Sequence, residues 1–171
     1  HWHNSTRLIQ LNIAMKSIFV IFFLLIPSLL HANSIGDVIM HEGSGVIERK
    51  ANGEEVTTQT ELDVFSFDTV KTGNGKTAIE FLDATRVDVT QHSKLTIDDF
   101  VYDPNTSTGK LSLKATLGTV RYASGQIAKL SPTSVSISTP TATIGVRGTD
   151  FSMTIDEFGS STIILLPSCN T

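Results

Sequence analysis

Apolar residues recur at every second position along most of the chain after Ser34. Val87 and Val89, for example, alternate with charged and hydroxylated residues. The same alternation returns at Leu95 and Ile97, at Leu111 and Leu113, at Val135 and Ile137, and at Phe151, Met153 and Ile155. Successive side chains of a β-strand point to opposite faces of a sheet, so this period of two predicts half-buried strands. We expect their apolar faces to form one continuous core between layers of sheet.

Turn-forming sequences separate the predicted strands at intervals of about eight to twelve residues, which is typical of a sandwich, barrel or solenoid. Clear examples are Ala51–Gly53, Gly73–Gly75, Asp103–Asn105 and Phe158–Gly159. No segment after Leu30 carries apolar residues at helical spacing over three turns, so we expect essentially no long helix there. The predicted fold class is all-β, a short-strand β-solenoid-like or β-sandwich domain over residues 33–171, behind an N-terminal signal-peptide helix.

The first 32 residues differ from the rest of the chain in composition. Lys16 precedes an apolar run from Ile18 to Leu30, and the small residue Ala32 follows it. This order predicts a secretory signal peptide over residues 15–32, cleaved after Ala32. Residues 1–14 are interpreted as upstream, unstructured sequence.

Two alternatives to a cleaved leader fit the sequence less well. A membrane anchor needs about 20 apolar residues, whereas this run is shorter and is interrupted by Pro27. No cysteine lies near Ala32, so a lipid anchor is not supported. We therefore expect a periplasmic or secreted protein of the bacterial envelope, without a stable membrane span after cleavage.

The single cysteine, Cys169, lies close to the last residue, Thr171. An unpaired cysteine in an oxidising compartment invites a partner, so one interpretation is a chain that is truncated at its C-terminus and continues beyond Thr171. The other is an exposed cysteine on a frayed tail. The sequence leaves both open, together with the oligomeric state.

The charge balance argues against a nucleic-acid partner. The chain carries 13 basic and 17 acidic residues, a net charge of −4. Only Arg7 and Lys16 are charged before residue 33, so residues 33–171 hold 11 basic against 17 acidic residues. Binding to phosphate backbones requires a basic stripe, and no run of Lys and Arg exists here.

No recognisable catalytic or metal-binding pattern is present. Gly73–Thr77 ends in Gly-Lys-Thr, but a Walker loop needs a glycine where Val70 stands, so we interpret the segment as a hairpin turn. His41 and His92 have no second ligand at metal spacing. An acidic group is interpreted as a solvated turn rather than a metal site: Asp98, Asp99, Asp103 and Asn105. We predict a non-enzymatic domain with no cofactor.

The most distinctive segment runs from Thr139 to Phe151. Its candidate site residues are Thr139, Pro140, Gly145, Val146, Arg147, Gly148, Thr149, Asp150 and Phe151. Two glycines three positions apart in a β-prone run predict bulges or close backbone approach. In the favoured interpretation Arg147 binds backbone carbonyls and the Asp150 carboxylate, which locks a sheet corner. In the other, Arg147 and Asp150 present a recognition surface.

This segment resembles the T-P-x-A-x-x-G-V-R-G-T-x-F signature of FecR domains. Four other stretches fall in register with that family: Gly36–Val38 with its opening, Phe67–Gly73 with G-D-x-V-x-T-G, Phe81–Thr85 with F-x-D-G-T, and Leu117–Arg121 with K-G-x-V-R. Phe67 and Ala84 stand where the family usually has glycine, so we expect less demanding backbone angles there. Ile163–Leu166 meets Pro167, and the C-terminal edge is expected to be incomplete.

The resemblance implies a periplasmic domain that works by protein contact. Membrane-spanning members of the family sense an outer-membrane transporter and control a sigma factor through a cytoplasmic segment, which we do not find in this chain, so iron signalling is not carried over. We expect an exported, non-catalytic interaction domain that binds a protein or a glycan in the cell envelope, with a role in signal transduction left open. The alternative is a structural spacer of a larger adhesin or surface protein.

Overall fold

A computed structural model describes residues 33–131 and 133–167. The predicted signal peptide, residues 1–14 and Cys169 lie outside the described residues. Within the described part, thirteen strands and one short helix form, and no helix reaches the length and apolarity needed to cross a membrane. The elements are β1 (Gly36–Glu42), β2 (Gly45–Glu48), β3 (Glu55–Thr57), β4 (Asp63–Val64), β5 (Thr69–Thr72), β6 (Lys76–Phe81), β7 (Arg86–Val89), β8 (Lys94–Asp103), β9 (Thr108–Ala123), α2 (Ile127–Leu130), β10 (Val135–Ser138), β11 (Thr143–Val146), β12 (Phe151–Ile155) and β13 (Ser161–Leu165). The predicted all-β class is confirmed.

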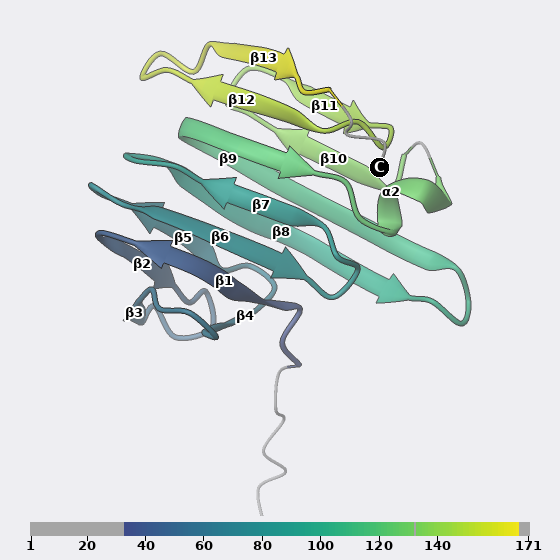
Figure 1. The fold of residues 1–171 in the computed structure, drawn as a ribbon, viewed down its shortest axis with the longest axis horizontal. Helices are drawn as coiled ribbons and strands as arrows, with labels where there is room; N and C mark the ends of the chain where they lie inside the picture. Colours follow the sequence, from purple (N-terminus) through teal and green to yellow (C-terminus); the bar gives the residue numbers. More distant parts are fainter. Residues whose placement is uncertain (1–32, 132, 168–171) are drawn as a thin grey trace, which may run out of the picture. The chain divides into compact units, whose positions relative to one another are not determined.

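The strands form two layers that share β9 (Figure 1). Sheet A has the order β4-β1-β6-β7-β9-β12-β13. Sheet B has the order β3-β2-β5-β8-β9-β10-β11. Neighbouring strands are antiparallel except β9 and β10, which are parallel. The sequence predicted either a β-solenoid or a β-sandwich. This layered, mostly antiparallel arrangement is a sandwich.

Strand β9 joins the layers because its two halves lie in different sheets. Residues 108–117 pair with β8 in sheet B, and residues 118–123 pair with β7 and β12 in sheet A. The change occurs at Gly118, whose φ is +83° and where an added Cβ would lie 2.6 Å from Cα of Ser93. Glycine is required for both reasons. The Leu117–Arg121 stretch therefore marks the passage of the chain from one sheet to the other.

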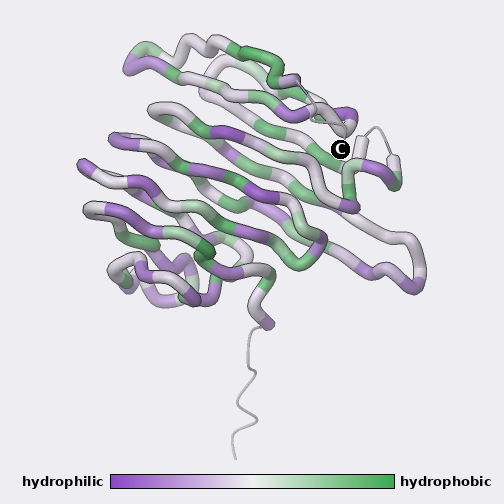
Figure 2. Tube along the Cα trace, in the orientation of Figure 1, coloured by the Kyte–Doolittle hydropathy of each residue, from purple (hydrophilic) through white to green (hydrophobic). Residues whose placement is uncertain are grey.

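The core lies between the two sheets, as predicted from the alternation. Green and purple segments alternate along the strands in Figure 2, and most apolar residues of β1 to β12 are buried. Phe81 of sheet A stacks on Phe100 of sheet B with ring centroids 5.4 Å apart. Helix α2 adds the fully buried side chain of Ile127. The continuous core expected from the sequence is thus present.

The Gly73–Thr77 segment is a connection between layers rather than a hairpin. Strand β5 ends at Thr72 in sheet B, and β6 begins at Lys76 in sheet A. The N–H of Gly73 donates to the carbonyl of Ser44 at 3.0 Å, which holds the corner. The hairpin prediction was wrong because a turn sequence does not say which sheet the next strand joins.

Candidate interaction site

The signature segment begins with the β10–β11 turn, which Thr139 holds together. The N–H of Thr139 donates to the carbonyl of Ala142 at 2.7 Å, and its hydroxyl accepts the N–H of Ala142 at 3.1 Å. The hydroxyl of Ser161 donates to Oγ1 of Thr139 at 3.1 Å, and the hydroxyl of Thr141 donates to the carbonyl of Gly159 at 2.9 Å. Gly159 lies in the β12–β13 connection, and Ser161 is the first residue of β13. These contacts tie the last turn of sheet B to the last turn of sheet A.

Asp150 stabilises the fold without Arg147. Its Oδ1 accepts the N–H of Ser124 at 2.8 Å, and its carbonyl accepts the N–H of Leu166 at 2.9 Å. Arg147 is exposed and takes part in none of the five ion pairs formed within residues 33–131 and 133–167. The expected Arg147–Asp150 pair is therefore not formed: the carboxylate binds the backbone N–H of Ser124, and Arg147 is exposed.

The two glycines of the signature do not produce bulges or close approaches. Strand β11 pairs with β10 in unbroken register from Thr143 to Val146. A Cβ added to Gly145 or Gly148 would meet no atom within 4 Å. Gly148 is suited to its position by a φ of +73°, a conformation that side chains rarely adopt. The expectation of bulges or close backbone approach was therefore wrong at both glycines.

The two apolar signature residues anchor the segment in the core. Val146 is 3% exposed and Phe151 is 4% exposed. The ring of Phe151 stacks on Tyr122 with centroids 5.2 Å apart. The exposed residues Arg147 to Thr149 lie between these two anchors, and Pro140 lies on the surface of the β10–β11 turn.

A groove of about 220 Å³ opens between β11 of sheet B and β13 of sheet A. Its lining consists of Ile144, Gly145, Val146, Arg147, Thr149, Phe151, Ile163 and Leu165. Five of the predicted site residues thus meet in one place, whereas Thr139, Pro140, Gly148 and Asp150 do not line it. Sequence reasoning missed Ile144, Ile163 and Leu165. The uninterrupted apolar run from Ile163 to Leu166, in a segment expected at an edge, was the signal available.

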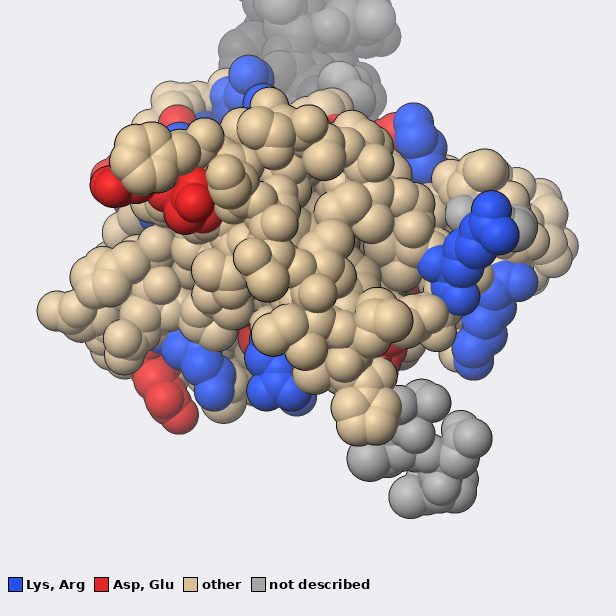
Figure 3. All heavy atoms as spheres, turned by 90° about the horizontal axis from the view of Figure 1, so that it is seen from above, with Lys and Arg blue, Asp and Glu red and all other residues tan. Residues whose placement is uncertain are grey.

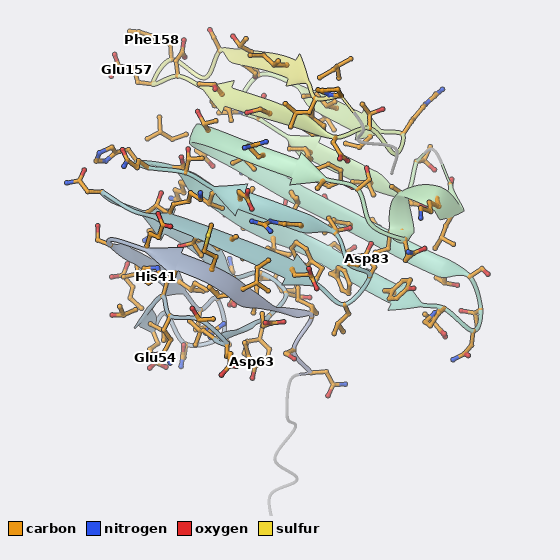
Figure 4. The ribbon with its side chains drawn as sticks, in the orientation of Figure 1. His41, Glu54, Asp63, Asp83, Glu157 and Phe158 are labelled. Atoms are coloured by element: carbon orange, nitrogen blue, oxygen red, sulfur yellow. The ribbon has the colours of Figure 1, made fainter. Side chains whose placement is uncertain are left out.

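Strands β11 and β13 are edge strands, since each pairs with only one neighbour among the described residues. Ile163, Ile164 and Leu165 are 41%, 61% and 69% exposed, and Phe158 is 84% exposed. Figure 3 looks onto this end of the domain and shows a broad central surface without charged atoms. Glu157 and Phe158 lie at the tip of the β12–β13 hairpin (Figure 4). An uncharged edge with exposed apolar side chains is a template for pairing with another strand.

A larger hollow of about 510 Å³ is lined by residues of β7 and β9, by Asp150 before β12 and by Leu166 and Pro167 after β13, but its charges are balanced. Two basic residues, Arg86 and Arg121, face two acidic residues, Asp88 and Asp150. Nε of Arg86 donates to Oδ1 of Asp88 at 2.8 Å. The hollow therefore offers no net charge by which to select a ligand.

The buried carboxylate of Asp83 belongs to the structural frame. It lies in the β6–β7 turn (Figure 4) and is 1% exposed. It accepts the N–H of Thr85 at 3.1 Å, the hydroxyl of Thr85 at 2.7 Å and the N–H of Ile127 at 3.0 Å. Asp83 thereby attaches α2 to the β6–β7 turn, which is far from α2 in the sequence.

The second buried carboxylate, Asp68, has a similar role beside β5. It accepts the N–H of Phe65 at 2.9 Å and forms an ion pair with Arg49. Burial raises the pKa of Asp68, and the hydrogen bond from Phe65 and the charge of Arg49 oppose that rise. The guanidinium of Arg49 also lies 4.9 Å from the ring centroid of Phe65.

Phe67 and Ala84 both keep the left-handed conformation, with φ of 70° and 64°. The expectation of less demanding angles was wrong. The N–H of Phe67 donates to the carbonyl of Ile97 at 2.7 Å, and the N–H of Ala84 donates to the carbonyl of Phe81 at 2.9 Å. The bond of Ala84 closes the β6–β7 turn, whereas that of Phe67 reaches β8, thirty residues further along the chain.

A family model described as FecR protein matches residues 68–166. No curated protein and no solved structure matches the chain. The matched range contains the signature segment, both edge strands and the groove between them. The opening stretch, Gly36–Val38, lies before it.

Proposed function

Since the chain belongs to the family of FecR proteins, we propose that it is an exported, non-catalytic module of the bacterial envelope that binds another protein through β11 and β13. The observation that carries this proposal is the apolar groove between these two edge strands, which five signature residues line. The signal-peptide pattern of residues 15–32 supports export.

The mode of binding is the addition of a strand. Ile163 and Leu165 are register partners of Met153 and Phe151, whose side chains are buried in the core. Since side chains alternate, Ile163 and Leu165 share the face that lines the groove. A partner strand that pairs with β13 satisfies the edge backbone by hydrogen bonds and places its own apolar side chains over the groove. Apart from Arg147, no charged residue of the described chain lines the groove, which favours a partner strand of low charge.

A photo-crosslinking experiment in the living envelope tests this proposal. A photoreactive amino acid replaces Ile164, which is 61% exposed on β13, and the matched control replaces Val101, which is 43% exposed on β8. We expect a protein adduct from position 164 alone. Ile163→Lys places a charge in the groove and should abolish the adduct. Equal adducts from both positions, no adduct at all, or an adduct that survives Ile163→Lys contradicts the proposal.

The structural spacer remains the alternative, and the identity of the adduct separates it from the binding module. Crosslinking of position 164 to a further module of the same polypeptide would mean that the edge is covered internally, as in a spacer. Crosslinking to a different envelope protein would mean that the edge is a recognition surface.

A further inference from the structure

Sheet B carries a hollow on its outer face, and we propose that this hollow binds an acidic oligosaccharide. The hollow measures about 420 Å³ and lies over β2, β5, β8 and β9, so it uses none of the residues that line the groove. An aromatic ring, threonine hydroxyls and lysines line it. The inference does not depend on protein binding at the edge strands.

Phe67 is the residue that points to a ligand. The residue is 54% exposed, and its φ of +70° is one that bulky residues rarely adopt. The residue therefore bears both backbone strain and an exposed apolar surface, and a glycine at this position would avoid both. Strained residues with exposed functional groups are found at binding sites. The ring is placed to receive the apolar C–H face of a sugar.

The polar groups beside the ring form a row across three strands. Thr69 of β5 is the register partner of Thr96 of β8, which in turn is opposite Lys114 of β9. The hydroxyls of Thr69 and Thr96 are 2.9 Å apart. All three residues line the same hollow as Phe67. Hydroxyls that both donate and accept, next to an aromatic ring, match the alternating hydroxyl and C–H surfaces of a sugar.

The lysines of the hollow favour an acidic sugar over a neutral one. Lys50, Lys94 and Lys114 line it, and none of them takes part in the five ion pairs formed by the described residues. Two carboxylates also line it, Glu48 and Asp98. The three lysines thus outnumber the acidic groups on a chain whose net charge is −4.

One of the two carboxylates is already held in an ion pair. Glu48 forms an ion pair with Lys71, which lowers the pKa of the Glu48 carboxyl. Lys71 also pairs with Glu55 at 3.1 Å. Asp98 is then the one acidic group of the hollow without such a pair among the described residues, and it can accept hydrogen bonds from sugar hydroxyls.

Titration calorimetry of the exported protein with hexagalacturonate tests this proposal. We expect binding that weakens with salt, and a loss of about tenfold or more in affinity for Phe67→Gly and for the double variant Lys94→Gln, Lys114→Gln. Phe67→Gly should raise the melting temperature at the same time, because it removes the strain, so its lost affinity cannot be ascribed to unfolding. Ala84→Gly is the matched control. It also places a glycine at a left-handed position, with φ of 64°, but outside the hollow, so affinity for the sugar should be unchanged.

Two comparison ligands define the chemical class. Cellohexaose, which is neutral, should bind more weakly than hexagalacturonate, and hexaglutamate, which has charge without sugar rings, should bind more weakly still. The proposal is overturned if hexagalacturonate shows no binding at millimolar concentration, if hexaglutamate binds as well, or if Phe67→Gly binds like the unchanged protein. Ile163→Lys should retain sugar binding, which separates this site from the edge strands.

Discussion

Pro140 of the β10–β11 turn packs against Gly159 of the β12–β13 turn, so closely that a Cβ added to Gly159 would lie 3.0 Å from Cβ of Pro140. Gly159 has a φ of +84°, and its carbonyl accepts the hydroxyl of Thr141. The two turns belong to different sheets. The first residues of the signature therefore act by joining the sheets beside the edge strands that form the groove.

We predict that Gly159→Ala destabilises the domain by about 2–4 kcal/mol, since the left-handed backbone and the contact with Pro140 both penalise a side chain. Gly53→Ala is the matched control, because Gly53 has a φ of +70° and no atom within 4 Å of an added Cβ. The control should lose only about 1–2 kcal/mol of stability, because only the left-handed backbone conformation penalises its side chain. Urea unfolding measures both. Equal losses would mean that the Pro140 contact contributes nothing.

Arg49→Met should destabilise the domain by about 3–5 kcal/mol at neutral pH, because it leaves the buried carboxylate of Asp68 without its cation. Lys71→Met removes exposed ion pairs with Glu48 and Glu55, and should cost less than about 1 kcal/mol. Urea unfolding at several pH values compares the two variants.

The cost of Arg49→Met should also depend on pH. Burial already raises the pKa of Asp68, and loss of Arg49 raises it further. The unfolded chain then releases the proton first as pH rises, so stability falls as pH increases above about 4. Below that pH the carboxyl is protonated in both states, and the part of the cost that comes from the unpaired charge should vanish. A pH-independent cost would contradict the charge explanation.

Alkaline unfolding should report on Tyr122. Burial raises the pKa of Tyr122 from 10.0 to about 12. Between these pH values the unfolded chain loses the proton while the folded chain retains it, so stability falls by about 1.4 kcal/mol per pH unit. Tyr122→Phe should remove this part of the pH dependence, as measured by urea unfolding from pH 9 upward. Identical slopes for the two proteins would show that Tyr122 does not titrate in this way.

Asp83→Ala should destabilise the domain by at least about 2 kcal/mol, because buried N–H groups of Thr85 and Ile127 lose their acceptor. Amide hydrogen exchange should accelerate in α2 in the same variant. Asp103→Ala is the control: its carboxylate accepts the N–H of Asn105 at 2.9 Å in an exposed turn, where water can replace it. A loss within about 0.5 kcal/mol is expected there. Unchanged exchange in α2 would argue against the role assigned to Asp83.

The candidate site was predicted in part. The signature segment drew attention to Val146, Arg147 and Phe151, and these do line the groove. The opposite wall of the groove is formed by β13, a strand that the sequence predicted only as an incomplete C-terminal edge. Its contribution depends on the pairing of β12 with both β9 and β13. Pairing between distant strands leaves no mark in the local pattern of residues, so the wall could not be assigned in advance.

The sequence by itself determined that the domain is built from β-strands around a continuous core, because the alternation of side chains is a local property of an extended backbone. It also located the signature and the turns. Only the tertiary structure decided that β9 serves both sheets, that Arg147 and Asp150 do not pair, and that Phe67 keeps a left-handed conformation. Each of these depends on hydrogen bonds between residues far apart in the chain, and such bonds form only once the two layers have come together.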